Sequence, residues 1–188
     1  MHGSSTSTDS TLTTVSGVPA SRLSNTFDSW QASANPGMEA AFARCVAVAK
    51  GESTKALLSG RPGTGKTHLA IAAMVEFGIL RSLLWKVPDF LDWIKNQAYD
   101  KELEMARILR PYREDPFLLV LDDLGVEQRT EWAYQQLYRV LDSRADNKLP
   151  TIITSNQLPD KIDERIVSRY RSGLVVCAGK DVRSRFDV

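Results

Sequence analysis

The segment Gly60–Thr67 reads Gly-Arg-Pro-Gly-Thr-Gly-Lys-Thr and matches the phosphate-binding loop pattern G-x-x-x-x-G-K-[ST] at every fixed position. It follows the apolar run Ala56–Leu58 and precedes a helix-like stretch, His68–Phe77. Glycines let the backbone curl so that successive N–H groups face one point, and the positive end of the following helix faces the same point. The sequence therefore predicts a strand, a phosphate-binding loop and a helix, in this order.

The chemistry of such a loop indicates a nucleotide with a magnesium ion. In loops of this pattern the lysine, here Lys66, reaches the β- and γ-phosphates, and the hydroxyl of Thr67 holds a Mg²⁺ that bridges them. We therefore expect ATP or ADP with Mg²⁺. A glycine turn before an ordinary helix is the alternative, and the Lys-Thr pair argues against it. The residues expected at the nucleotide are Gly60, Arg61, Pro62, Gly63, Thr64, Gly65, Lys66, Thr67 and His68.

Bulk composition limits the classes of protein that the chain can represent. Its 188 residues fit one domain that buries a core without disulfide or metal cross-links. The 24 basic and 23 acidic side chains nearly cancel, which excludes a global positive field that attracts nucleic acid or anionic lipid. Cys45 and Cys177 lack metal-ligand neighbours and indicate reduced thiols. Because no apolar run approaches the roughly 18 residues of a membrane span, we expect a cytoplasmic protein without membrane contact.

The N-terminal segment differs in composition from the rest. Ten of the first sixteen residues are Ser or Thr, which offer little apolar surface to offset the entropy of ordering. We predict a flexible tail over residues 1–25 and a folded domain over residues 26–188, with order beginning near Phe27 and Trp30. The next segment has a helical pattern, and it either lies against the nucleotide base or forms a packed flanking helix. The apolar residues of this pattern are Met38, Ala41, Phe42, Cys45, Val46 and Ala49.

Downstream, short apolar runs alternate with helical patterns. The runs cover residues 56–59, 82–87, 117–121, 151–154 and 174–177, and helical patterns follow at 88–97, 101–109, 130–144 and 160–170. Strands separated by helices form a parallel sheet that is covered on both faces. We predict an α/β fold with three layers, αβα, around a five-stranded parallel sheet. Ligands of such folds bind beyond the carboxyl ends of the strands.

Polar residues follow two of the predicted strands. Asp122 and Asp123 end the apolar run Leu118–Leu121, and Asn156 follows the run that begins at Thr151. We expect Asp122 to hold Mg²⁺ through water, and Asp123 to polarise the attacking water. Asn156 is expected to orient that water, with a simple turn former as the alternative.

The helical pattern at 160–170 carries a basic column. Lys161, Arg165 and Arg169 stand at i, i+4 and i+8, and like charges at this spacing repel by roughly 0.2–0.5 kcal/mol per pair. Phosphates or an acidic neighbour facing the column would relieve this repulsion. A solvated face, partly neutralised by nearby acidic residues, is the alternative.

Together these segments resemble the AAA+ ATPases of the DnaC-type helicase loader group, which includes the IstB-like transposition ATPases. The resemblance is carried by Gly60–Thr67, Leu119–Gly125, Thr154–Asn156 and Glu164–Arg169, and it extends from about Phe27 to Arg185. It implies a P-loop AAA+ domain that lacks the C-terminal helical lid of most AAA+ proteins. Because loaders usually have an N-terminal helicase-binding domain, it also implies either an isolated ATPase domain or different partner contacts.

The resemblance also implies roles for three arginines. In the group, the residue matching Arg169 is an arginine finger that reaches the nucleotide of a neighbouring subunit, and the residue matching Arg165 lies beside it. This implies a homo-oligomer that forms with ATP. Arg183 matches a sensor arginine near the γ-phosphate, although the group often has an aromatic residue where Val182 stands. Many AAA+ proteins carry Glu where Asp123 stands, although loader-like relatives also use Asp, and the shorter side chain, by roughly 1.5 Å, implies slow hydrolysis. The arginine finger implies that hydrolysis depends on assembly.

A mixture of aromatic and basic residues between the second and third predicted strands suits single-stranded DNA, because bases stack on aromatic rings beside cations. The alternative for the aromatic rings is packing on the sheet, so the cations are the better candidates for DNA contacts. The residues concerned are Phe90, Trp93, Lys95, Tyr99, Lys101, Arg107, Arg110 and Arg113.

Three functions remain open from the sequence. The first is an ATP-dependent loader that places a DnaB-type replicative helicase on single-stranded DNA. The second is an IstB-like transposition regulator that acts on duplex DNA with a transposase. The third is a small-molecule kinase or switch NTPase, which would be active as a monomer.

Overall fold

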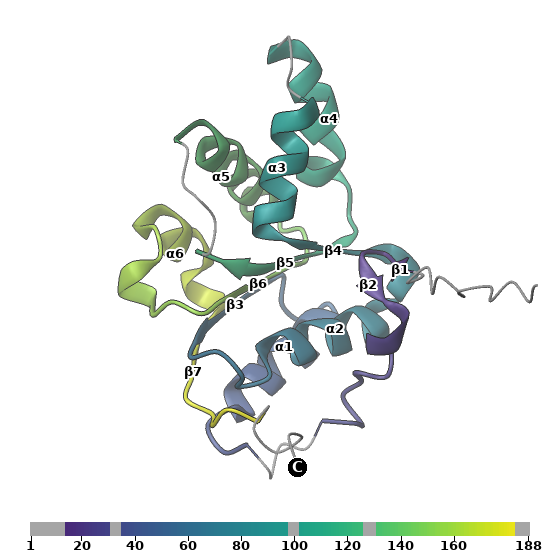
Figure 1. Ribbon diagram of the computed structural model, residues 1–188, viewed down its shortest axis with the longest axis vertical. Coiled ribbons are helices and arrows are strands. Elements are labelled where there is room, and N and C mark those ends of the chain that lie inside the picture. Colours follow the sequence, from purple (N-terminus) through teal and green to yellow (C-terminus); the bar gives the residue numbers. More distant parts are fainter. Residues whose placement is uncertain (1–13, 31–34, 98–101, 126–130, 183–188) are drawn as a thin grey trace, which may run out of the picture.

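The computed structural model describes residues 14–30, 35–97, 102–125 and 131–182. Its centre is a five-stranded sheet in which every neighbouring pair is parallel, as predicted (Figure 1). The order across the sheet differs from the order along the chain, and the strand with the phosphate loop lies between the last two strands. In spatial order the strands are β4 (Ser82–Lys86), β5 (Leu118–Leu124), β6 (Thr151–Ser155), β3 (Lys55–Gly60) and β7 (Leu174–Cys177).

Helices cover both faces of the sheet, which confirms the three-layer prediction (Figure 1). One face carries α1 (Glu39–Ala49) and α2 (Lys66–Phe77). The other carries α3 (Val87–Gln97), α4 (Glu102–Glu114), α5 (Glu131–Asp146) and α6 (Glu164–Tyr170). Each face has its own apolar core, because successive side chains of a strand point to opposite sides. In β5, Leu119 and Leu121 join one core, whereas Leu118 and Val120 join the other.

The helix predicted at 160–170 begins later than expected. Pro159–Lys161 form a separate 3₁₀ turn, η4, and α6 starts at Glu164. Asp163 is the N-cap, and its carboxylate accepts a hydrogen bond from the backbone N–H of Arg165 at 2.8 Å. Lys161 lies 3.6 Å from Asp160 and is not on α6. The prediction of a three-residue basic column on one helix is therefore wrong, because only Arg165 and Arg169 lie on α6.

The aromatic residues proposed for DNA stacking belong largely to the core. Phe90 is fully buried, and Trp93 is half-buried against Trp85 and Tyr112 with ring centroids 5.6 and 5.4 Å away. The packing alternative is therefore confirmed for these two rings, and the burial of Phe90 excludes it from stacking on bases. Arg107 and Arg110 are exposed, Lys95 pairs with Asp92, and Arg110 pairs with Glu114. Tyr99 and Lys101 lie outside the described residues.

Part of the predicted tail has a defined structure. Residues 14–22 form a short hairpin, β1 (Thr14–Val15) and β2 (Val18–Pro19), followed by a 3₁₀ turn, η1 (Ala20–Arg22). The carbonyl of Ser16 accepts a hydrogen bond from the N–H of Leu84 at 2.9 Å, so the segment lies along edge strand β4. Val18 is fully buried. The composition did not predict this structure, because a single buried side chain, Val18, and contacts with the edge strand are enough to order a segment rich in Ser and Thr.

A buried arginine connects three elements on the face covered by α5. The side chain of Arg144 is fully buried, and burial lowers its pKa to about 10, so it stays charged at neutral pH. Its guanidinium donates hydrogen bonds to the carbonyl oxygens of Tyr112 (2.8 Å), Phe117 (2.6 Å) and Pro150 (3.0 Å) and to Thr151 Oγ1 (2.9 Å). One side chain thus joins α4 to the starts of β5 and β6.

We expect Arg144→Met to lower the free energy of unfolding by about 3–5 kcal/mol, because buried acceptors lose their donor. Urea unfolding followed by circular dichroism measures the change. Arg139→Met is the matched control, since Arg139 lies on the same helix and is exposed. Equal stability of the two variants would contradict the structural role of Arg144.

Both cysteines are free and buried, in agreement with the predicted reduced thiols. Among the described residues, no helix is long and apolar enough to cross a bilayer.

Candidate functional site

The phosphate loop connects β3 to α2, as the sequence predicted. Gly63 and Gly65 have φ angles of 78° and 100°, a region that favours glycine, and Gly65 is the N-cap of α2. The first N–H groups of α2 have no partner within the helix and are available to an anion. The ammonium group of Lys66 is buried and donates to the carbonyl oxygens of Gly60 and Arg61, at 2.8 and 2.7 Å. Lys66 therefore lies inside the curl of the loop.

Asp122 lies directly beside the start of α2. Its Oδ1 accepts hydrogen bonds from Thr67 Oγ1 at 2.9 Å and from Thr154 Oγ1 at 2.5 Å. The carboxyl group is buried, and this burial raises its pKa. The two hydroxyls act in the opposite direction, since they stabilise the carboxylate. The structure thus brings together the two residues predicted for Mg²⁺, Thr67 and Asp122.

This pair fits a magnesium ion. Mg²⁺ binds hard oxygen ligands and usually takes only one or two from the protein, with water and phosphate oxygens supplying the rest. A hydroxyl and a carboxylate 2.9 Å apart at the phosphate loop match this pattern. Among the described residues, no group of three or more His, Cys, Asp or Glu side chains indicates a different metal site.

The backbone at Asp123 departs from a regular strand. Its φ angle is 62°, and the pairing of β5 with β6 shifts by one residue between Leu121 and Leu124, which is a β-bulge. The N–H of Asp123 donates to Thr154 Oγ1 at 3.0 Å, and its carboxylate accepts from Asn156 Nδ2 at 3.0 Å. The bulge therefore separates the two carboxylates, and it directs Asp123 to Asn156 at the end of β6.

Asp122 provides a test that involves pH. Because burial raises the folded-state pKa, the folded protein binds this proton more tightly than the unfolded chain. Stability is then highest below the unfolded pKa and is lost as pH rises through the folded pKa. We expect Asp122→Asn to raise the Tm of the nucleotide-free protein at neutral pH, with a smaller gain under acidic conditions. The amide oxygen can still accept from Thr67 and Thr154.

Thermal unfolding in EDTA at acidic and at neutral pH measures the effect. Asp89→Asn is the control, because Asp89 is an exposed carboxylate that lines the cavity beside Asp122. The Asp122→Asn variant should also lose the stabilisation that Mg²⁺ with ATP confers on the wild type. A Tm for Asp122→Asn below that of the wild type at neutral pH would contradict the inference that the ionised carboxylate of Asp122 destabilises the nucleotide-free protein.

Two segments that are distant along the chain contact the loop, one before α1 and one after β7, and the sequence did not reveal the first of them. Asn35 is buried and bridges them: its Nδ2 donates to the carbonyl of Thr64 and its Oδ1 accepts from the N–H of Lys180, both at 2.6 Å. The N–H of Val182 donates to the carbonyl of Gly63 at 3.0 Å. A lone Asn before a helix carries no motif, so only the folded chain identifies it. Arg183, the predicted sensor arginine, lies outside the described residues.

Trp30 lies against the loop as well. A Cβ atom at Gly65 would overlap the indole ring of Trp30, so the two are in close contact. The ring of His68 lies 5.3 Å from that indole, and burial lowers the pKa of His68. The indole N–H of Trp30 is buried and has no hydrogen-bond partner among the described residues. The helical segment predicted after Trp30 is α1, and its buried residues Ala41, Cys45 and Val48 share a core with α2, so the packed-helix alternative is confirmed. A contact of this segment with the nucleotide base remains a prediction.

Arg165 and Arg169 lie apart from the loop, on α6. Arg169 forms ion pairs with Asp142 at 2.6 Å and Asp146 at 2.9 Å, both on α5. Arg165 pairs with Asp163 at 3.0 Å, and its guanidinium lies 5.0 Å from the ring centre of Tyr138. Both arginines line a hollow that contains no loop residue, and the acidic neighbours relieve the expected charge repulsion.

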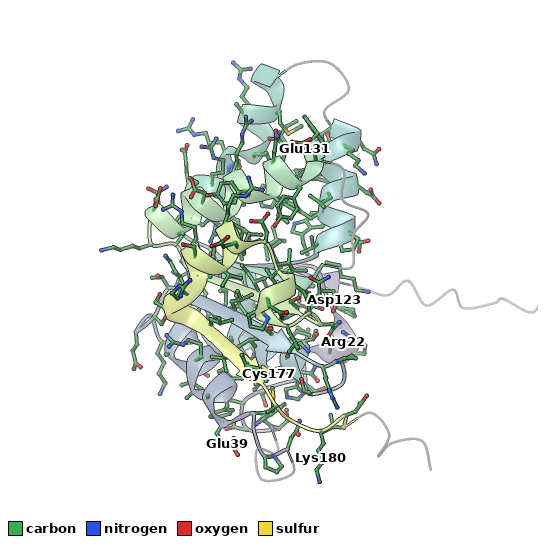
Figure 2. All side chains as sticks on the ribbon, turned by 90° about the vertical axis from the view of Figure 1, so that its left-hand side faces the viewer. Arg22, Glu39, Asp123, Glu131, Cys177 and Lys180 are labelled. Carbon is green, nitrogen blue, oxygen red and sulfur yellow. The ribbon has the colours of Figure 1, made fainter. Side chains whose placement is uncertain are left out.

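The structure therefore places the phosphate loop together with Asp122, Asp123 and Asn156, and it places Arg165 and Arg169 on a separate surface. In Figure 2, Asp123 and Arg22 are labelled on the same side of the molecule, and Lys180 marks the segment that approaches the loop.

Residues 56–177 match the family described as "ATPase family associated with various cellular activities (AAA)".

Two curated relatives show how far the similarity extends. The replicative helicase loader DnaI of Bacillus subtilis (strain 168) is 34% identical over 117 residues, which cover 61% of this chain and 37% of DnaI. A putative ATP-binding protein in an insertion sequence of Mycobacterium tuberculosis (strain ATCC 25618 / H37Rv) is 30% identical over 142 residues, which cover 72% of this chain and 54% of that protein. The chain thus spans about half or less of the length of these relatives.

A solved structure shows the same fold. The crystal structure of the DnaC helicase loader superposes with a TM-score of 0.68 and 24% identity, covering 84% of this chain and 99% of that one. At this identity the similarity establishes the architecture alone.

Proposed function

Because this chain belongs to the ATPase family associated with various cellular activities, we propose that it binds ATP in the loop between β3 and α2 and hydrolyses it. One observation carries the proposal: the hydroxyl of Thr67, the last loop residue, donates to the buried carboxylate of Asp122 at 2.9 Å. Oxygen ligands at this place suit a Mg²⁺ that accompanies ATP.

The residues of the loop would bind and position the phosphates. The N–H groups at the start of α2 face the phosphate oxygens, and the ammonium of Lys66 exchanges the carbonyls of Gly60 and Arg61 for the β- and γ-phosphates. Thr67 and Asp122 would hold Mg²⁺, which neutralises charge on the phosphates when bound. These contacts stabilise negative charge as the bond to the γ-phosphate breaks.

Asp123 and Asn156 form the proposed pair that acts on water. Their hydrogen bond of 3.0 Å holds the carboxylate at the end of β5, next to the metal ligand Asp122. A carboxylate there can accept a proton from the attacking water, and the amide fixes its orientation. We propose that turnover is slow, since Asp123 has a shorter reach than a glutamate.

Arg169 would complete the site of a neighbouring copy. Its side chain is about two-fifths exposed, so it is accessible at the surface of α6. In the single subunit Asp142 and Asp146 hold its guanidinium, and in the assembly we propose that the γ-phosphate of the adjacent subunit replaces part of this pairing. An arginine that acts across an interface makes hydrolysis depend on a homo-oligomer.

The biological process we propose is DNA replication. The similarity to the replicative helicase loader DnaI supports a role in which the ATPase acts with a DnaB-type helicase on single-stranded DNA. The exposed cations Arg107 and Arg110 on α4 are the DNA contacts we favour. The two free thiols suit the cytoplasm, a reducing compartment.

A pull-down with the DnaB-type helicase of the same genome tests this role. We expect capture of the helicase to depend on ATP, and to be lost on replacing Lys66. Failure to capture or alter that helicase under any nucleotide condition would exclude the loader function for this chain.

The second candidate is a transposition regulator that assembles on duplex DNA with a transposase. The similarity to an ATP-binding protein in an insertion sequence favours it specifically. Electron microscopy with ATP distinguishes the candidates, because filaments on duplex DNA support the regulator. A clear preference for single strands in a binding titration supports the loader.

A further inference from the structure

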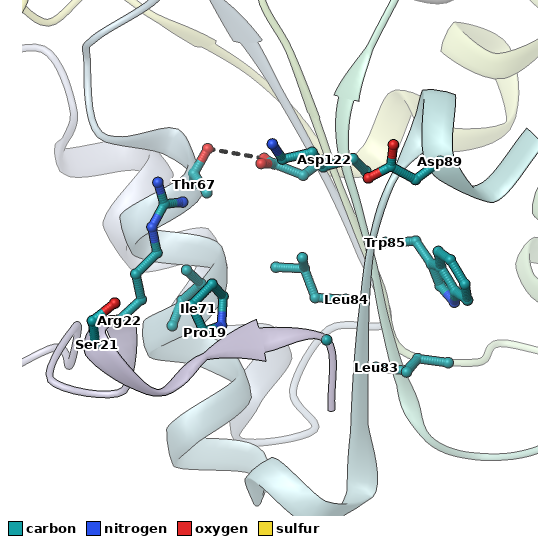
Figure 3. A pocket seen from close by; sticks show the side chains of 12 residues that line it. Pro19, Ser21, Arg22, Thr67, Ile71, Leu83, Leu84, Trp85, Asp89 and Asp122 are labelled. Carbon is teal, nitrogen blue, oxygen red and sulfur yellow. Dashed lines mark hydrogen bonds between the residues drawn. The ribbon is translucent and has the colours of Figure 1, made fainter. Parts of the chain in front are cut away.

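A cavity of about 570 Å³ opens beside the proposed magnesium ligands. Thr67 and Asp122 form one side of it, and β4 contributes its carboxyl end with Lys86. The opposite wall is the N-terminal segment, which contributes Pro19 and Arg22 (Figure 3). The cavity therefore lies between the phosphate loop and a part of the chain that no motif identifies.

Arg22 is the charged group that this segment directs into the cavity. Figure 3 shows its side chain reaching from η1 toward the Thr67–Asp122 pair. Arg22 and Asp122 line the same cavity, so a positive charge enters the space beside the proposed metal ligands. Within the described residues, the guanidinium of Arg22 forms no ion pair or side-chain hydrogen bond, which leaves its donors for a ligand.

The hairpin fixes the direction from which Arg22 enters. Gly17 has a φ of 81°, and a Cβ atom there would overlap the backbone carbonyl of Leu84, so the chain approaches β4 as closely as only glycine permits. Ser16 donates from its hydroxyl to the carbonyl of Ile79 at 2.6 Å, and Val18 is fully buried. These contacts lie four to six residues before Arg22 and hold the start of η1 in place.

A guanidinium suits one particular ligand at this position. Its planar donors match phosphate oxygens, and it is charged at every physiological pH. The nucleotide group beside Thr67 and Asp122 is the end that carries Mg²⁺, namely the β- and γ-phosphates. ATP presents one more phosphate there than ADP, so a donor that reaches from the cavity distinguishes the two.

We propose that Arg22 contacts the γ-phosphate of ATP bound in its own subunit, and that the N-terminal hairpin thereby senses whether ATP or ADP is present. This inference rests on the proposed ATPase function. It adds a phosphate contact within the subunit to the arginine contributed by a neighbour, and it makes the segment before the domain part of the nucleotide site.

The test is nucleotide affinity, measured by calorimetry with Mg²⁺ and either ADP or the non-hydrolysable β,γ-imido analogue of ATP. We expect Arg22→Ala to weaken the analogue by about 10- to 100-fold, the range of one charge-assisted hydrogen bond, and ADP by less than about twofold. Lys86→Ala is the matched control, since it removes one positive charge from the same cavity. Thermal unfolding of each variant verifies that the fold is intact.

Each outcome decides a different point. Equal weakening of both nucleotides, no weakening, or the same selective loss in Lys86→Ala would overturn the role of Arg22 while leaving the ATPase proposal intact. A wild-type protein that binds neither nucleotide would overturn both.

Proteolysis supplies a readout that needs no variant. Trypsin cleaves after arginine, and Arg22 is exposed in this structure. We expect the ATP analogue to slow cleavage after Arg22, and ADP to leave it unchanged. Cleavage after Arg81, an exposed arginine that lies over the ring of Phe77, serves as the internal reference. Equal protection by both nucleotides would contradict a contact to the γ-phosphate.

Discussion

Replacing Lys66 by alanine should weaken ATP binding by about 100-fold or more and remove hydrolysis with it. The ammonium makes charged hydrogen bonds to the phosphates, each worth about 1.5–3 kcal/mol, and Arg61, the other cation of the loop, is exposed. Its present contacts to Gly60 and Arg61 place it where those phosphates bind. Calorimetric titration with ATP and Mg²⁺ measures the loss.

Lys50→Ala is the control for this experiment, because Lys50 is exposed at the C-cap of α1 and lies outside the loop. Lys66 is itself buried, so thermal unfolding must show that the alanine variant is folded. Near-normal ATP affinity in a folded Lys66→Ala protein would refute the nucleotide site.

Arg169→Ala should reduce hydrolysis by about 10³- to 10⁵-fold, the range of an arginine finger, while ATP affinity changes little. The separation is expected because Arg169 stabilises charge in the transition state of a neighbouring site. Its own environment, Asp142 and Asp146, contains no part of the phosphate loop. Phosphate release at saturating ATP measures the effect, and Arg171→Ala, an exposed arginine just beyond α6, is the control.

Mixing two inactive variants makes this test specific. A Lys66→Ala subunit lacks a working loop but keeps Arg169, and an Arg169→Ala subunit has the opposite defect. Partial recovery of hydrolysis on mixing would show that the arginine acts between subunits, and it would exclude a kinase or switch active as a monomer. The rate per subunit of the wild type should also rise with protein concentration. A constant rate would argue against assembly-dependent hydrolysis.

Local patterns predicted much of the fold. The five strands of the main sheet appear where apolar runs were bounded by helical patterns, and the loop Gly60–Thr67 joins strand to helix as its glycines indicated. Such features depend on neighbours in sequence, so periodicity and glycine positions are sufficient. The start of α6 at Glu164 was missed, because Asp163 caps the helix and the preceding turn is separate.

The candidate site also combines features that local sequence patterns predicted with features that depend on contacts between distant segments. The sequence identified Thr67 and Asp122 as partners because each ends a recognisable local pattern, and the structure places them 2.9 Å apart. The bulge that turns Asp123 toward Asn156 depends on the pairing of β5 with β6, a contact between distant segments. The hydrogen bond from Thr154 to Asp122 arises from the same pairing.

By itself, the sequence determined a strand, a phosphate loop, a parallel sheet and the carboxylate that we propose for Mg²⁺. Only the tertiary structure decided that Asn35 joins the loop to Lys180, and that Arg22 enters a cavity beside Asp122. The physical reason is that a motif records the local geometry needed to bind a phosphate. The side chains that reach the loop from elsewhere depend on how the sheet, its edge strand and the N-terminal hairpin pack.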